Sequence, residues 1–219
     1  MNRLAIFDCD GTLADGAANI CAAMDDCFLE AGLAVPPAGA TRRIVGLSLP
    51  EAMRLLHPTG SDDDHRSLAQ RYKQVFQRMR ARGMAPDPLF EGMAEAISEL
   101  DAAGWLLGVA TGKSDRGLAI CLDHHGLRSR FVTLQTADRH PSKPHPSMIE
   151  AAMAEAGAVP ATTAMIGDTS YDMAMARAAG VLAIGVAWGY HEPEELTASG
   201  AHRISMTPSD IPRLLEEGA

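Results

Sequence analysis

The sequence has 219 residues, of which 47% are hydrophobic and 21% charged, so it is long enough for one large core or for two domains. Its net charge of -9 argues against nucleic acid or an anionic membrane surface as a main partner. The first residues lack the apolar core of a signal peptide, and no apolar run approaches the ~20 residues of a membrane span. The cysteines show no C-x-x-C spacing, which favours buried thiols over disulfides or a zinc site. We therefore expect a cytoplasmic protein with no membrane partner.

The chain begins with an apolar run over residues 4–7, which predicts a buried strand of a parallel sheet. From residue 17 to residue 83 apolar residues recur at helical spacing, for example over 17–31 and 50–56, and no strand pattern occurs. Helices and strands then alternate along the chain. The predicted helices cover 93–103, 114–124, 146–156 and 171–179, and the predicted strands cover 105–110, 131–134, 163–166 and 181–186, with a short strand near Ile204 before a last helix.

Alternation of this kind builds a doubly wound parallel sheet with helices on both faces. Because the first strand precedes the helical block, that block is most simply an insertion after strand one. We predict an α/β protein with a catalytic core of residues 1–14 and 89–219 and a helical cap domain of residues 15–88. The segments 14–16 and 86–88 would link the two domains and form a hinge.

Two carboxylates follow the first predicted strand, in the string Asp8-Cys9-Asp10-Gly11-Thr12. Ligands of doubly wound sheets bind just beyond the carboxyl ends of the strands. Residues two apart on an extended segment point the same way, so Asp8 and Asp10 can converge on one metal ion or one reacting group. Most strings of this kind form only a polar turn, so the interpretation depends on the other strand ends.

Polar residues also follow three further predicted strands. Thr111 and Gly112 offer a hydroxyl and backbone N–H groups to an anion, although an ordinary helix cap has the same pattern. The proline after Lys143 favours an extended backbone and so directs the ammonium group; a solvated surface lysine is the alternative. Asp168 lies at a strand end, whereas Asp172 lies in a first helical turn, where acids often only complement the helix dipole.

These strings occur in the order D-x-D-G-T, T-G, K-P and G-D-x-x-x-D, and together they resemble the haloacid dehalogenase superfamily. The chain is similar to the branch with a helical cap inserted after the first motif, which includes phosphoglycolate phosphatases and beta-phosphoglucomutases. The resemblance covers nearly the whole chain and implies a Rossmann-like core, a phosphatase activity and Mg²⁺ as the cofactor. It places the site at Asp8, Asp10, Thr111, Gly112, Lys143, Asp168 and Asp172.

The chemistry of phosphate transfer is consistent with this set of residues. A carboxylate that attacks a phosphate ester meets like charge, at about 4 kcal/mol per pair of unit charges ~4 Å apart in a dielectric of about 20, so a cation is required. We expect Mg²⁺ to be bound by Asp8, Asp168 and the backbone carbonyl of Asp10. Asp8 would be the nucleophile and form an aspartyl phosphate. Asp10 would protonate the leaving oxygen and later take a proton from water.

The remaining residues are expected to support this reaction. Lys143 would keep Asp8 ionised and share the phosphate charge, while Thr111 and the Gly112 N–H would orient the phosphoryl oxygens. The resemblance assigns Asp172 to the support of Lys143 or of a metal-bound water. Related enzymes commonly carry Asn where this chain has Gly112, so contacts to the leaving group are expected to differ.

Other functions fit the sequence less well. A P-loop NTPase is rejected because residues 108–114 are one residue short of that motif. An EF-hand fails because Leu13 and Asn19 stand where that loop needs Gly and Glu. Asp10 argues against a haloalkanoate dehalogenase, which has no leaving oxygen to protonate. A non-catalytic binding module would be expected to have lost Lys143 or one of the acids.

The predicted substrate is a small phosphorylated metabolite, and phosphoglycolate is the first candidate because of the resemblance. The alternative is a beta-phosphoglucomutase-like phosphotransferase, which must hold a second phosphate. In those mutases the cap loop resembling Gly46-Leu47-Ser48 is followed by an arginine, whereas this chain has Leu49 and Pro50, which favours hydrolysis. Arg42 and Arg43 are the candidate ligands of a distal phosphate in the mutase alternative. The oligomeric state is not predicted.

Overall fold

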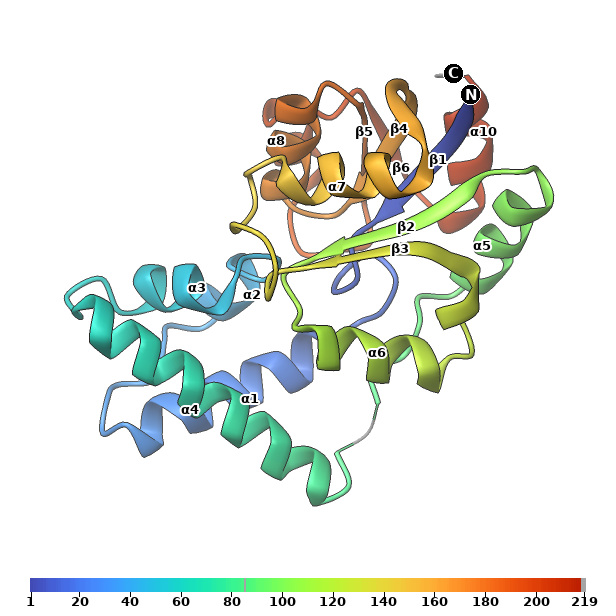
Figure 1. The fold of residues 1–219 in the computed structure, drawn as a ribbon. Coiled ribbons are helices and arrows are strands. Elements are labelled where there is room, and N and C mark those ends of the chain that lie inside the picture. Colours follow the sequence, from blue (N-terminus) through green and yellow to red (C-terminus); the bar gives the residue numbers. More distant parts are fainter. Residues whose placement is uncertain (85, 218–219) are drawn as a thin grey trace.

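A computed structural model describes residues 1–84 and 86–217 of the chain, and Figure 1 shows its ribbon. Its centre is a six-stranded sheet in the order β3-β2-β1-β4-β5-β6, in which every neighbouring pair is parallel. The strands are β1 (Asn2–Phe7), β2 (Leu106–Thr111), β3 (Phe131–Thr136), β4 (Ala158–Gly167), β5 (Leu182–Val186) and β6 (Arg203–Ser205). The strand order changes direction at β1, so the predicted doubly wound α/β class is confirmed.

Alternate side chains of β1 point to opposite faces of the sheet, as the pleat of a strand requires. Leu4 and Ile6 belong to one buried cluster, and Ala5 and Phe7 belong to another. The first cluster lies under α7 (Ser147–Ala156), α8 (Ser170–Ala179) and α9 (Pro193–Ala198). The second lies under α5 (Met93–Ala102), α6 (Asp115–His124) and α10 (Ile211–Glu216). Helices on both faces explain why β1 is apolar at successive positions.

Four helices form a separate group beside the carboxyl ends of the strands (Figure 1). They are α1 (Ala17–Glu30), α2 (Ala40–Arg43), α3 (Leu49–Leu56) and α4 (Asp62–Ala81). α4 begins where Ser61 and Asp64 cap it reciprocally, because each side chain accepts the backbone N–H of the other. The buried apolar side chains of α1, α3 and α4 pack into a cluster of their own, which contains Met24, Met53 and Tyr72.

Two chain segments connect this helical group to the sheet, and they run side by side. Ala14 forms an antiparallel bridge with Leu89. The Asp15 N–H donates to the Pro88 carbonyl at 2.8 Å, and the Phe90 N–H donates to the Leu13 carbonyl at 3.1 Å. A paired connection of this kind is where a hinge would lie. The division into domains at residues 14/15 and 88/89 stays a prediction.

Beyond shifts of one or two residues at element ends, the observed α-helices and strands differ from the predicted ones at α2, α9 and β4. α2 and α9 were not predicted, because helices of four and six residues carry too few turns to show a periodic pattern. β4 begins at Ala158 rather than at residue 163, and its first residues are exposed or half-buried, which removes the apolar signal. Among the described helices, none combines the length and the hydrophobicity needed to cross a membrane. The cytoplasmic location stays a prediction.

Candidate active site

Asp8 lies directly after β1 and is completely buried. Its N–H donates to the Ile166 carbonyl at 2.9 Å, so the sheet ladder holds its backbone one residue beyond the strand. Its Oδ1 accepts the Cys9 N–H at 2.6 Å. Gly11 then turns the chain at φ +85°, a conformation that side chains disfavour. The backbone at the end of β1 therefore fixes the position of the Asp8 carboxylate.

Lys143 lies between two buried carboxylates. Its Nζ is 2.9 Å from Asp8 Oδ2 and 2.6 Å from Asp172 Oδ1, and all three side chains are fully buried. Burial acts to lower the pKa of Lys143, but the charges of Asp172 and Asp8 outweigh it and raise that pKa above its ordinary value. Lys143 is therefore a fixed ammonium group rather than the solvated surface lysine of the alternative interpretation.

Asp172 combines the two roles weighed from the sequence. Its Oδ1 contacts Lys143, while its Oδ2 accepts the Thr169 hydroxyl at 2.7 Å and the Thr169 N–H at 3.1 Å. The Thr169 side chain in turn accepts the Asp172 N–H, which completes a capping box at the start of α8. One carboxylate thus caps a helix and anchors the lysine.

Asp168 is held at the end of β4 by two hydrogen bonds. Its Oδ1 accepts the Thr12 hydroxyl at 2.8 Å, and its Oδ2 accepts the Tyr190 N–H at 3.0 Å. A Cβ atom at Gly11 or Gly189 would collide with the Asp168 carboxylate, so both glycines permit its position. The supporting contacts from Thr12 and Tyr190 were not predicted, although Thr12 belongs to the first motif.

One oxygen from each of Asp8, Asp168 and Asp172 lies within 4.8 Å of the others. Burial raises the pKa of Asp8 to about 7, against the lowering effect of Lys143, and raises the pKa of Asp168 well above its ordinary value. Apart from its ion pair with Lys143, Asp8 Oδ2 has no polar partner of standard geometry among the described residues. A buried, underbonded carboxylate beside a second one fits a hard divalent cation, which prefers oxygen ligands.

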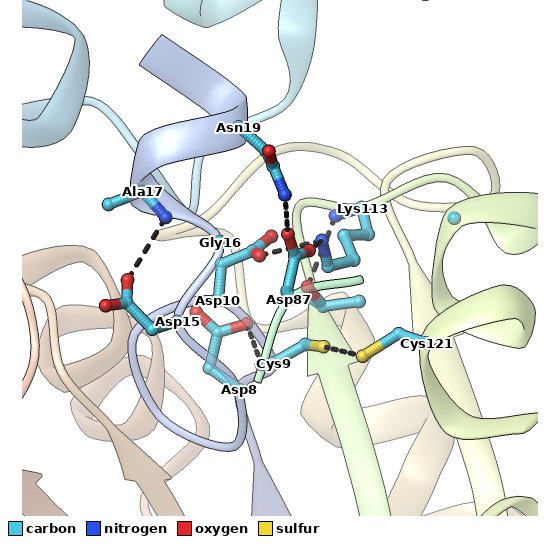
Figure 2. Close-up of polar contacts among 12 residues, drawn as sticks. Asp8, Cys9, Asp10, Asp15, Gly16, Ala17, Asn19, Asp87, Lys113 and Cys121 are labelled. Carbon is cyan, nitrogen blue, oxygen red and sulfur yellow. Dashed lines mark hydrogen bonds and ion pairs between the residues drawn. The ribbon is translucent and has the colours of Figure 1, made fainter. Parts of the chain in front are cut away.

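The Asp10 carboxylate is not part of this acidic cluster and faces Lys113 instead (Figure 2). Asp10 Oδ1 is 2.7 Å from Lys113 Nζ, and Asp87 Oδ2 is 3.5 Å from the same nitrogen. Burial raises the pKa of Asp10, and the charge of Lys113 opposes that shift. A metal contact through the Asp10 backbone oxygen stays a prediction. Lys113 and Asp87 were missed as site residues.

Thr111 ends β2, and Gly112 follows it against the loop of residues 46–48. Thr111 is buried, and its Oγ1 accepts the Lys113 N–H at 3.2 Å. A Cβ atom at Gly112 would lie 2.5 Å from the Gly46 carbonyl oxygen. The Ser48 N–H donates to Ser142 Oγ at 2.9 Å, which ties the same loop to the segment before Lys143. The helical group therefore contacts the sheet at the predicted site.

A cavity of about 490 Å³ opens between the helical group and the sheet. Its wall includes Asp10, Gly112 and Lys113 from the sheet side and Tyr72 and Arg80 from α4. Asp8 and Asp10 thus face different surroundings, because Asp8 belongs to the buried acidic cluster and Asp10 borders the cavity. This volume suits a small metabolite.

Comparisons with known proteins agree with this geometry. A family model described as haloacid dehalogenase-like hydrolase matches residues 5–186. The probable phosphatase IndB of Dickeya dadantii is 37% identical over 213 residues, which cover 96% of this chain and 92% of that protein. A phosphoglycolate phosphatase of Pseudomonas putida is 30% identical over 218 residues, which cover 97% of this chain and 78% of that protein. A hydrolase of known structure from Pseudomonas syringae is 25% identical, with a TM-score of 0.86 and complete coverage of both chains.

These matches confirm the predicted resemblance and the prediction of a phosphatase. The family match includes all three acids of the cluster, Asp8, Asp168 and Asp172. The chain therefore belongs to the haloacid dehalogenase-like hydrolase family.

Proposed function

We propose that the chain is a Mg²⁺-dependent phosphatase that hydrolyses a small phosphorylated metabolite through a phosphorylated Asp8. The observation that carries this proposal is the arrangement around Asp8. Its Oδ2 lies 2.9 Å from the buried ammonium of Lys143 and has no other polar partner of standard geometry among the described residues. A carboxylate oxygen kept underbonded next to a fixed cation is suited to attack a phosphorus atom.

The proposed metal site comprises Asp8, Asp168 and the backbone carbonyl of Asp10. Asp172 contributes an oxygen to the acidic cluster, but its Oδ1 lies 2.6 Å from Lys143 Nζ and its Oδ2 belongs to the capping box of α8. We therefore assign Asp172 to the support of Lys143. A bound Mg²⁺ would supply the positive charge that lets an anionic nucleophile approach an anionic phosphate.

The protein side chains have separate proposed roles in the reaction. Asp8 attacks phosphorus while the bond to the leaving oxygen breaks, and Asp10 gives that oxygen a proton. Thr111 and the Gly112 N–H orient the phosphoryl oxygens, and Lys143 shares their charge. In the second half Asp10 takes a proton from the water that releases phosphate from Asp8.

Residues 15–88 are proposed as a cap that covers the site. The cavity between this segment and the sheet would hold the leaving group beside Asp10. The named relative from Pseudomonas putida and the motif resemblance make phosphoglycolate the first candidate substrate. Its carboxylate would enter a cavity whose wall includes the cationic side chains of Lys73 and Arg80.

A screen of the purified protein against phosphorylated metabolites tests this proposal, with kcat/KM compared across the panel. We expect phosphate release with Mg²⁺ and none in a chelator. Added Ca²⁺ should restore little, because its looser and higher coordination does not reproduce the octahedral geometry of Mg²⁺. Full activity in the chelator, or no phosphate release from any panel member, contradicts the proposal.

A further inference from the structure

Lys113 is a buried ammonium group to which the proposed reaction assigns no role. Its side chain is 9% exposed and follows Thr111 and Gly112 at the end of β2. Its Nζ lies between two carboxylates, 2.7 Å from Asp10 Oδ1 and 3.5 Å from Asp87 Oδ2 (Figure 2). A buried ammonium is costly unless it is paired, so its position is set by these two acids.

Asp87 is itself fixed from both sides of the hinge. Its Oδ1 accepts the Asn19 side-chain amide at 2.6 Å, which comes from α1. Its carbonyl oxygen lies 2.8 Å from Nε2 of His125, which follows α6. The side chain is 9% exposed. Asp87 is therefore held by contacts with α1 and with the residue after α6, and it presents one oxygen to Lys113.

The Asp10 carboxylate has few other contacts that could fix its direction. Asp10 Oδ1 accepts no hydrogen bond of standard geometry from the described residues, so the ion pair with Lys113 is its principal polar contact. The same oxygen packs against Gly16, where a Cβ atom would collide with it. The orientation of Asp10 thus depends on Lys113 on one side and on a glycine on the other.

We propose that Lys113, anchored by Asp87, is a positioning residue that directs the Asp10 carboxyl group toward the leaving oxygen. The inference rests on the proposed role of Asp10. The proton moves from Asp10 to the leaving oxygen as the bond to phosphorus breaks, and Lys113 neither gives nor takes a proton. Direct binding of the substrate by Lys113 is the competing explanation, because Lys113 also borders the cavity.

A pair of aryl phosphates separates the two explanations. Phenyl phosphate leaves as a weakly acidic phenol and needs the proton, whereas p-nitrophenyl phosphate leaves as a much stabler anion and needs it little. Neither carries a second anionic group of the kind that a substrate-binding lysine would recognise. The value of kcat/KM covers the steps up to leaving-group release, so it reports this proton transfer and not the later hydrolysis.

We expect Lys113→Met to lower kcat/KM for phenyl phosphate by about tenfold or more and for p-nitrophenyl phosphate by less than about threefold. The ratio of kcat/KM for p-nitrophenyl phosphate to kcat/KM for phenyl phosphate should therefore rise. Because both values come from one protein sample, a loss of folded protein cancels from the ratio. Lys113→Arg should restore most of the wild-type ratio, since it keeps the charge. An unchanged ratio in Lys113→Met contradicts the inference and favours a substrate-binding or structural lysine.

Two further variants complete the test. Asp87→Asn removes the charge that anchors Lys113 without shortening the side chain. It should raise the same ratio, by a smaller factor than Lys113→Met does. Arg130→Met gives the same change in net charge as Lys113→Met, but Arg130 pairs with Asp101 instead, and it should leave the ratio unchanged. Failure of the proposed function is distinguishable, because phosphate release from the aryl phosphates would then be unchanged in Asp8→Asn.

Discussion

The Gly46 carbonyl oxygen lies 2.5 Å from the point where a Cβ atom of residue 112 would stand, so the loop of residues 46–48 rests directly on Gly112. The same loop approaches the nucleophile, because a Cβ atom at Gly46 would lie 3.8 Å from Asp8 Oδ2. Related enzymes commonly carry Asn at the position of Gly112. In this chain the backbone of the loop takes up the space of that side chain.

Gly112→Ala is therefore expected to displace the loop of residues 46–48 from its position over the site. Backbone atoms cannot yield as a flexible side chain can, and displacement of a positioning element by about 1 Å can cost a hundredfold in rate. We predict a fall in kcat/KM of about tenfold or more for every substrate. Wild-type activity in Gly112→Ala contradicts this role of the loop.

The pKa of Asp8 predicts how Mg²⁺ stabilises the protein. Without metal, burial raises the pKa of Asp8 from 3.8 to about 7, so the folded state binds more protons than the unfolded state between these values. The free energy of unfolding of the metal-free protein should then fall as the pH rises through that window. Mg²⁺ binds the ionised carboxylates, so it should raise Tm more at about pH 8 than at about pH 5.5. Thermal unfolding with and without Mg²⁺ at both pH values checks this. An equal rise in Tm at the two pH values would contradict the prediction.

Lys143 should be essential for stability as well as for activity. Lys143→Met leaves Asp8 and Asp172 buried without their cation, which costs about 3–5 kcal/mol of unfolding free energy. Lys73→Met is the matched control, because Lys73 pairs with Asp138 at 3.6 Å and both side chains are more than a third exposed. That pair should contribute less than about 1 kcal/mol. Urea unfolding in the absence of metal checks both values, and a similar loss in the two variants would argue against a buried ammonium at residue 143.

The sequence was sufficient to predict the sheet and most of the acidic cluster. Apolar runs followed by polar residues located the ends of β1, β2 and β4, and parallel strands bring such ends together. Asp172 was harder to assign, because a helix-capping acid and a lysine partner look the same in sequence. The structure shows that its two oxygens serve these two purposes separately.

The pairing of Lys113 with Asp10 and Asp87 could not be predicted from the sequence. Asp87 lies in a linker with no periodic pattern, and its approach to β2 depends on how two distant segments pack. In the sequence, Lys113 stands in a string that resembles a P-loop, and nothing in that string indicates that its side chain is buried. Residues of such a linker take their partners from tertiary contacts, which local sequence patterns do not encode.

Hydrolysis is expected to dominate over phosphoryl transfer between sugars. Arg42 donates to the Gly189 carbonyl at 3.1 Å, and Arg43 pairs with Glu195 at 2.8 Å. Both arginines thus contact the sheet side of the molecule, and neither is among the described residues that line the cavity. With beta-glucose 1-phosphate and its 1,6-bisphosphate, run beside phosphoglycolate, we predict release of inorganic phosphate. If isomerisation to glucose 6-phosphate were faster than phosphate release from any monoester, the protein would be a mutase.

Trapping the phosphoryl group on the enzyme is the most direct test of whether it passes through Asp8. A single turnover with Mg²⁺ and the best substrate of the screen is quenched in acid, and the peptide that carries residue 8 is analysed by mass spectrometry. We predict a phosphoryl group on Asp8 in the wild type. Asp8→Asn should remain folded and show neither the adduct nor phosphate release. Turnover by Asp8→Asn above a few per cent of the wild-type rate, or a phosphoryl group on another residue, would contradict the account.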